Sequence, residues 1–289
     1  MTPERVSFLS GSNLLQGLFF RPARQAPSPG VVVTGSWTSV KEQMSATYAQ
    51  ALAHKGYAAL CFDFRGWGES TGTPRYLEDP IRKAADIVAA FDFMAGHEVV
   101  DAKRIAGLGI CASAGYMSQA AAISPVPRAV CLVAPWLHDE QIVQEVYGGE
   151  EGVAALIAKS RAVEHGGETV IEAASVTNPA SLMYQAPYYT EPARGLIPQY
   201  DNRFDLRSWE PWLRFDGVGS AERLSLPTCI VHSRAAAIPH GTERFAARLG
   251  MQASLFWLEG ISQFDFYDRP DAVEAAMRHV EAHLATHCR

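Results

Sequence analysis

Residues 104–115 constrain the fold of this chain more than any other stretch. Residues 105–110 form a short apolar run bounded by small residues, which is typical of a fully buried parallel strand. Residues 114–123 are mostly small and predict a helix. Cys111 lies between the two runs. We therefore expect a strand, a sharp turn and a helix, with a cysteine side chain presented at the turn.

The residues around Cys111 favour a strained turn. Gly109 and Ser113 lie two positions away on either side, where small residues leave room for the backbone. This pattern resembles the nucleophile elbow of the α/β-hydrolase superfamily, with cysteine in place of serine, as in its dienelactone-hydrolase-like branch. The elbow pattern can also be centred on Ser113, because Gly115 lies two positions after it. Since the predicted strand ends immediately before Cys111, we predict Cys111 as the nucleophile, and a buried structural thiol is the alternative.

The resemblance implies an α/β-hydrolase fold, with a mostly parallel central sheet flanked by helices. Strand-like apolar runs and helical patterns do alternate along most of the chain. The alternation stops between 138 and 220, where aromatic residues are frequent. Because that segment is too long for a loop within a compact domain, we predict a mainly helical cap at 138–220, inserted into a core formed by 1–137 and 221–289.

Composition narrows the class of partner. A chain of 289 residues with 48% hydrophobic residues can bury a large core, and its net charge of −6 includes no basic run that would bind nucleic acid. We find neither an apolar stretch long enough for a membrane span nor a secretion signal, so we expect a cytoplasmic protein that does not bind membranes. No cluster of His, Cys and carboxylate residues has metal-ligand spacing, so we predict no structural zinc, and we expect no cofactor. A homodimer is the default expectation.

Two loops depart from the catalytic pattern that the resemblance implies. An acid is expected after the strand that ends at Ser233, and a histidine after the last strand, at 254–258. The first loop reads Arg-Ala-Ala-Ala at 234–237, and Gln263 stands near the place of the histidine. Because Gln263 cannot carry a proton, the base and its orienting partner are both missing.

A cysteine needs less help than a serine. A thiol with a pKa of about 8.5 is a few per cent ionised at neutral pH. We also expect the N-terminus of the following helix to lower the pKa of Cys111. The backbone N–H groups of Ala112 and of Ser36 or Trp37, in the loop after the first central strand, are predicted to form the oxyanion hole.

Other side chains are candidates for the missing proton carriers. His138 follows the strand that ends at Ala134, His232 lies at the end of the next predicted strand and His240 lies in the loop after it, all on the active-site side of the sheet. Glu69, in the loop 63–70 that resembles the D-x-R-G-x-G-x-S loop of many α/β-hydrolases, and Asp265 are candidate general bases. For each of these side chains, the alternative is a purely structural role. The residues predicted to contact the substrate are Trp136, Tyr147, Tyr188, Gln263 and His240.

These observations predict an α/β-hydrolase-fold enzyme in which Cys111 attacks a small-molecule ester, lactone or thioester. An amide is disfavoured, because its leaving group needs an acid. Two other functions stay open. One is a non-hydrolytic reaction, such as cyclisation, acyl transfer or carbon–carbon cleavage, that depends on oxyanion stabilisation. The other is a ligand-binding protein without catalysis.

Overall fold

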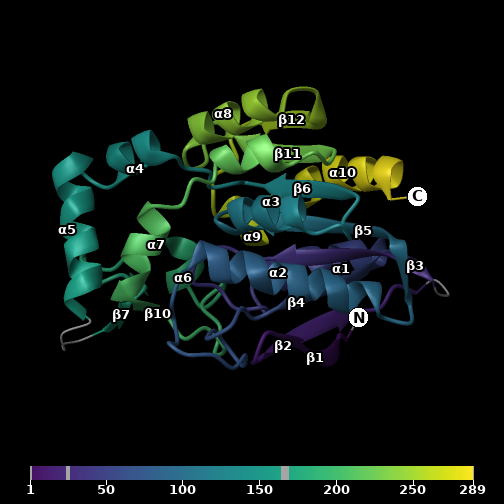
Figure 1. Cartoon of the computed structure of the whole chain (residues 1–289), viewed down its shortest axis with the longest axis horizontal. Helices are drawn as coiled ribbons and strands as arrows, with labels where there is room; N and C mark the ends of the chain where they lie inside the picture. Colours follow the sequence, from purple (N-terminus) through teal and green to yellow (C-terminus); the bar gives the residue numbers. More distant parts are fainter. Residues whose placement is uncertain (1, 24–26, 164–168, 289) are drawn as a thin grey trace.

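An eight-stranded sheet runs through the molecule (Figure 1), whose computed structural model describes residues 2–23, 27–163 and 169–288. The strand order is β1-β2-β4-β3-β5-β6-β11-β12. Its strands are β1 (Glu4–Ser10), β2 (Asn13–Phe20), β3 (Ser28–Thr34), β4 (Ala58–Phe62), β5 (Val100–Ile110), β6 (Ala129–Val133), β11 (Thr228–Ser233) and β12 (Ala253–Leu258). The hairpin β1–β2 and the pair β2–β4 are antiparallel, and the other pairs are parallel. The hairpin β1–β2 forms one edge of the sheet.

Helices cover both faces of this sheet, because its central strands are apolar on both sides. The helices that pack on the sheet are α1 (Met44–His54) and α10 (Pro270–His287), with α2 (Pro80–Ala95), α3 (Ser113–Ile123) and α8 (Pro239–Leu249). In α2, the Asp79 carboxylate caps the helix by accepting from the N–H groups of Ile81 and Arg82. Ile81, in the first turn of α2, is 65% exposed and lies away from the buried side of the helix.

The segment 138–220 leaves the sheet after β6 and returns before β11. Its elements are α4 (Glu140–Val146), α5 (Gly149–Ala162), β7 (Val170–Glu172), β8 (Ala174–Ser175), β9 (Met183–Tyr184), α6 (Pro187–Thr190), β10 (Arg203–Asp205), η2 (Leu206–Ser208), α7 (Trp209–Leu213) and η3 (Gly219–Arg223). The strands form two small sheets, β7–β10 and β8–β9, separate from the central one. Sequence patterns did not predict these strands, which are too short to show alternation. Figure 1 places α4, α5 and α7 together at one end of the molecule.

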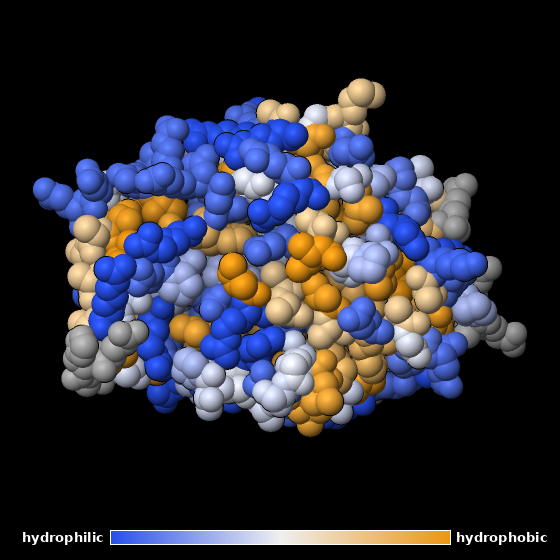
Figure 2. All heavy atoms as spheres, in the orientation of Figure 1, coloured by the Kyte–Doolittle hydropathy of each residue, from blue (hydrophilic) through white to orange (hydrophobic). Residues whose placement is uncertain are grey.

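Hydrophilic side chains cover most of the face shown in Figure 2, with patches of hydrophobic side chains between them. Among the helices that the structure describes, none is both long enough and apolar enough to cross a membrane. All five cysteines are buried and free.

Candidate active site

Cys111 lies at a strained turn between β5 and α3. Its φ of +56° is in the left-handed region, which is uncommon for a residue with a side chain. At Gly109, a Cβ atom would lie 2.7 Å from the carbonyl oxygen of Ser113 and 2.9 Å from the Cα of Ala114. Helix α3 therefore approaches β5 so closely that the backbone at 109 accepts only glycine. The predicted strand, turn and helix are present.

Ser113, the alternative centre of the elbow pattern, is fully buried in the first turn of α3. Its Oγ accepts from the Ile110 N–H at 3.1 Å and donates to the Thr34 carbonyl at 2.9 Å. It thus ties the elbow to the end of β3 and is absent from the lining of the cavity described next.

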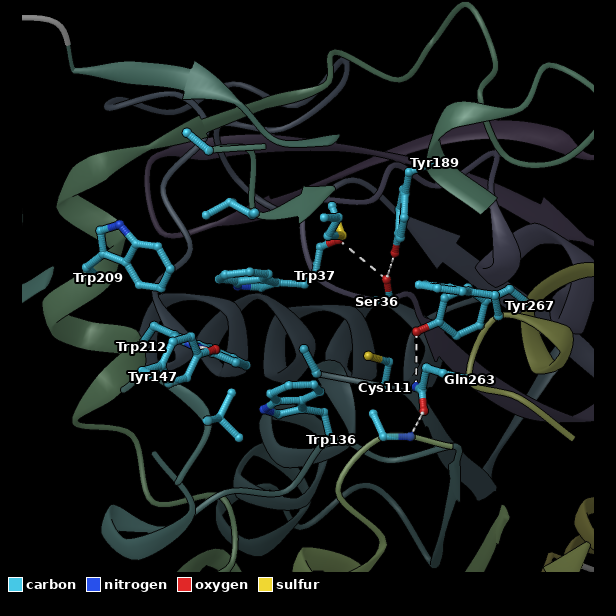
Figure 3. A pocket seen from close by; sticks show the side chains of 17 residues that line it. Ser36, Trp37, Cys111, Trp136, Tyr147, Tyr189, Trp209, Trp212, Gln263 and Tyr267 are labelled. Carbon is cyan, nitrogen blue, oxygen red and sulfur yellow. Dashed lines mark hydrogen bonds between the residues drawn. The ribbon is translucent and has the colours of Figure 1, made fainter. Parts of the chain in front are cut away.

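Cys111 faces a cavity of about 620 Å³ at the carboxyl ends of the central strands (Figure 3). The loops after β3, β5, β6, β11 and β12 line it, together with the segment 138–220. Its aromatic lining residues are Trp37, Trp136, Tyr147, Tyr189, Trp209, Trp212, Phe264 and Tyr267. Among the described residues that line the cavity, none is Asp, Glu, Lys, Arg or His. The cavity therefore suits a neutral, largely apolar ligand.

Hydrogen-bond donors surround the sulfur of Cys111. They are the hydroxyl of Tyr267 and the N–H groups of Ala112 and Trp37, and the side chain of Gln263 lies beside the sulfur as well. The N–H of Ser36 instead points at the Met44 sulfur, 3.4 Å away. Ser36 and Trp37 were the two candidates for the second backbone N–H of the oxyanion hole. Of these two, Trp37 is the one whose N–H is directed at the sulfur. Ser36 still lines the cavity, with its hydroxyl hydrogen-bonded to Tyr189.

Burial raises the pKa of Cys111 above its ordinary value. The donors around the sulfur act in the opposite direction because they favour the thiolate, but desolvation outweighs them. We had expected the helix N-terminus to lower this pKa, and the net direction is the reverse. The thiol therefore carries its proton at neutral pH.

Gln263 and Tyr267 occupy the region after β12 where the resemblance places a histidine. The Nε2 of Gln263 donates to the Ala134 carbonyl at 2.8 Å and to the Tyr267 hydroxyl at 3.1 Å, and its Oε1 accepts from the Ala237 N–H at 3.1 Å. Because the Tyr267 oxygen accepts from Gln263, its own proton is directed at Cys111. Burial holds the pKa of Tyr267 well above its usual range, so the phenol stays neutral.

Sequence reasoning missed Tyr267. Its position in α9 (Asp265–Asp268) is four residues after Gln263, a spacing that places two side chains close together on a helical turn. This spacing is the signal that could have found it.

His138 lies behind the tryptophans of the cavity rather than in its lining. Its Nδ1 accepts from Trp136 Nε1 at 3.0 Å, and its Nε2 donates to the Trp212 carbonyl at 3.1 Å. Burial lowers the pKa of His138 to about 4. With both ring nitrogens engaged and no access to the cavity, His138 has no free group for proton transfer.

The other two candidate histidines also lie outside the lining. His232 is fully buried at the end of β11 and donates from Nε2 to the Ala237 carbonyl at 3.0 Å. His240 is 42% exposed on α8, with its Nε2 3.2 Å from Glu145. Its position on the outer surface removes His240 from contact with a ligand in the cavity.

The candidate carboxylates are held by partners of their own, also outside the lining. Glu69 accepts from Arg5 and from Lys41, each at 2.6 Å, and these hydrogen bonds lower its pKa to about 2. Asp265 accepts from the N–H of Ser262 at 2.9 Å and from its hydroxyl at 2.6 Å. Both carboxylates therefore stabilise loops.

Some of the residues predicted to contact the substrate line the cavity, and others do not. Trp136, Tyr147 and Gln263 line the cavity, whereas Tyr188 does not. Tyr188 is buried beneath the lining, with its ring packed edge-on against Tyr267 at 5.1 Å between centroids. Its ring therefore supports Tyr267 and does not face the ligand.

The sheet order, the elbow and a cavity at the carboxyl ends of the strands define an α/β-hydrolase fold, as predicted. The crystal structure of the hypothetical protein PA2218 from Pseudomonas aeruginosa is similar, with a TM-score of 0.86 at 23% identity over 99% of this chain and 93% of that chain. The α/β hydrolase GrgF from Penicillium sp. sh18 has a TM-score of 0.83 at 19% identity, over 100% and 99% of the two chains.

Sequence comparisons relate the chain to hydrolases and acyltransferases. The family model of X-Pro dipeptidyl-peptidase (S15 family) matches residues 12–154, which include the elbow. The uncharacterised protein YcjY of Escherichia coli (strain K12) is 28% identical over 93% of this chain and 94% of that protein. The acyltransferase drtE of Aspergillus calidoustus is 29% identical over 57% and 53%, and a thiohydrolase of Eupenicillium brefeldianum is 33% identical over 46% and 42%.

Proposed function

We propose that this chain is an acyl-transfer enzyme in which Cys111 takes a neutral acyl group from a thioester. One observation carries this proposal: the sulfur sits at a strained elbow with the N–H groups of Trp37 and Ala112 directed at it. A carbonyl carbon attacked by this sulfur would place its oxygen beside the same two donors, where negative charge develops. The cysteine nucleophile and the likeness to the dienelactone-hydrolase-like branch are part of this proposal.

A thioester suits a site that lacks a base. When the Cys111 thiol attacks a thioester, a new thioester forms and a thiol leaves, so the proton of Cys111 ends on the leaving sulfur and none is consumed. Tyr267, directed at the Cys111 sulfur, can donate a hydrogen bond to whichever sulfur carries charge. A peptide would instead release an amine that must be protonated, and no described lining residue is an ordinary acid for that step.

The acyl group is expected to be apolar or aromatic, because the cavity is walled by neutral and mostly aromatic side chains. Tyr147, Trp209 and Trp212 of the segment 138–220 supply part of that wall, which supports a role of the segment as a cap. The sequence relatives that are a thiohydrolase and an acyltransferase support thioester chemistry.

The second half of the reaction favours transfer over hydrolysis. Gln263 stands where a histidine would activate water, and its amide is engaged with Ala134, Ala237 and Tyr267. An amine or a thiol attacks a thioester without strong general-base assistance, and its proton passes to the departing Cys111 sulfur. We therefore expect an acyl-enzyme that passes its acyl group to such an acceptor faster than to water.

Intact-mass spectrometry tests the proposal. The chain is incubated with short thioesters of benzoate, phenylacetate and hexanoate, alongside Cys111→Ala and Ser113→Ala. We expect an adduct of the acyl mass on the wild type and on Ser113→Ala, and none on Cys111→Ala. A wild type that forms no adduct and releases no thiol with any of these esters would contradict the proposal. Adding an amine acceptor to the isolated adduct then separates transfer from hydrolysis.

A further inference from the structure

Glu78 is a fully buried carboxylate that the proposed chemistry does not use. Its Oε1 accepts from Lys83 Nζ at 2.6 Å and from the Tyr116 hydroxyl at 2.8 Å, and its Oε2 accepts from the Thr38 N–H at 3.2 Å. Its own N–H donates to Ser208 Oγ at 2.8 Å. Helix α2, the elbow helix α3, the loop after β3 and the segment 138–220 therefore meet at this one residue.

The contact with Thr38 lies next to the oxyanion hole. Thr38 follows Trp37, whose N–H is directed at the Cys111 sulfur. The φ of Thr38 is +59°, a left-handed conformation that is unfavourable for a β-branched residue and persists only where surrounding contacts hold it. Glu78 holds the Thr38 N–H, and Tyr200 lies 3.2 Å from the Thr38 hydroxyl. These contacts maintain the turn that aims the Trp37 N–H.

The contact with Tyr116 reaches the other half of the site. Tyr116 is on α3, little more than one turn after the elbow, and its hydroxyl is buried against Glu78. One carboxylate thus binds both the helix that carries Cys111 and the loop that carries Trp37.

Lys83 supplies the compensating charge. It is buried, and its ammonium lies 4.6 Å and 4.7 Å from the ring centres of Phe64 and Trp67. Removing one member of a buried ion pair leaves an uncompensated charge, whereas replacing both with neutral groups is often tolerated. Glu78 and Lys83 can therefore be varied together without leaving a buried charge unpaired.

We propose that Glu78 is a positioning residue for the oxyanion hole. It fixes the Trp37 N–H relative to Cys111, and Lys83 compensates the charge of Glu78. This inference rests on the proposed acyl transfer at Cys111. It concerns the carbonyl-attack step, in which charge moves from the sulfur to an oxygen. Alkylation of the same sulfur by iodoacetamide forms no oxyanion, so a shift of the Trp37 N–H changes it only through the loss of one donor to the sulfur, which is a smaller effect.

Two double variants that differ in one hydrogen-bond acceptor test the inference. Glu78→Gln/Lys83→Met keeps an oxygen for the Thr38 N–H, and Glu78→Ala/Lys83→Met removes it, while neither leaves a buried charge. We expect acylation of Cys111 to fall about 10- to 100-fold in the alanine variant and within about threefold in the glutamine variant. Alkylation by iodoacetamide should stay within about threefold of the wild type in both double variants, because no more than one hydrogen-bond donor to the sulfur shifts.

Hydrogen exchange of the peptide that contains Trp37 and Thr38 supplies a readout that does not need a substrate. We expect faster exchange in the alanine variant than in the glutamine variant. Equal exchange in the two folded variants overturns the positioning role, even if the wild type accepts no thioester and the proposed function fails. Equal acylation in the two variants, or an equal loss of alkylation and acylation in the alanine variant, also overturns it.

Discussion

The hydroxyl of Tyr267 accepts a hydrogen bond from Gln263 Nε2 at 3.1 Å and directs its own proton at the Cys111 sulfur. This pair places a neutral donor where a hydrolase of this fold carries a histidine. A phenol with its pKa well above the usual range cannot act as a base at neutral pH, but it can stabilise charge on sulfur. Under the proposed function, this arrangement favours acylation of Cys111, and none of the described residues that line the cavity is a His, Asp or Glu that could activate water.

Replacing Tyr267 with phenylalanine should slow acylation of Cys111. The variant loses a hydrogen bond to a developing charge, which corresponds to a decrease of roughly tenfold to a hundredfold. Single-turnover thiol release from a thioester measures the rate. Tyr188→Phe is the matched control, because that tyrosine is also buried but lies outside the lining. Equal rates in the two variants would show that the Tyr267 hydroxyl has no role in acylation.

Alkylation of Cys111 by iodoacetamide should increase with pH above neutral. Burial raises its pKa, so the thiolate forms at a higher pH than in a free thiol, whose pKa is about 8.5. Mass spectrometry with Cys111→Ala as the control assigns the modified residue among the five cysteines. A midpoint below that of a free thiol would mean that the donors around the sulfur outweigh desolvation.

Gln263→His should shorten the lifetime of the acyl-enzyme in water. An imidazole beside the acylated sulfur can accept a proton from water, and such general-base assistance contributes about 100-fold or more. Decay of the acyl mass over time measures the lifetime. Gln263→Met removes the amide without adding a base, and we expect it to decay no faster than the wild type. If the histidine variant decays like the methionine variant, a missing base does not limit hydrolysis.

Gly109→Ala should destabilise the fold by about 1–3 kcal/mol, because the added methyl group meets backbone atoms of α3 that cannot move independently. Urea unfolding measures the change. Gly96→Ala is the control, since a Cβ there makes only ordinary contacts at 3.7 Å. A Gly109→Ala variant as stable as the control would mean that α3 can shift away from β5.

The sequence alone determined the α/β arrangement, the position of the elbow at Cys111 and the presence of Gln263 where a histidine is expected. Each of these follows from short-range patterns: strand and helix periodicity, small residues around one turn, and the residue types in two loops. The frequent aromatic residues of 138–220 also indicated what lines the cavity, although the short strands β7 to β10 were not predictable.

Only the tertiary structure decided which groups meet at the sulfur. It brings Tyr267 to Cys111, selects the N–H of Trp37 over that of Ser36, and buries His138 behind two tryptophans. The reason is physical: where a side chain points, and how far it is desolvated, depend on packing between segments far apart in the chain. For the same reason, the pKa of Cys111 is raised overall, although the N-terminus of α3 alone would lower it.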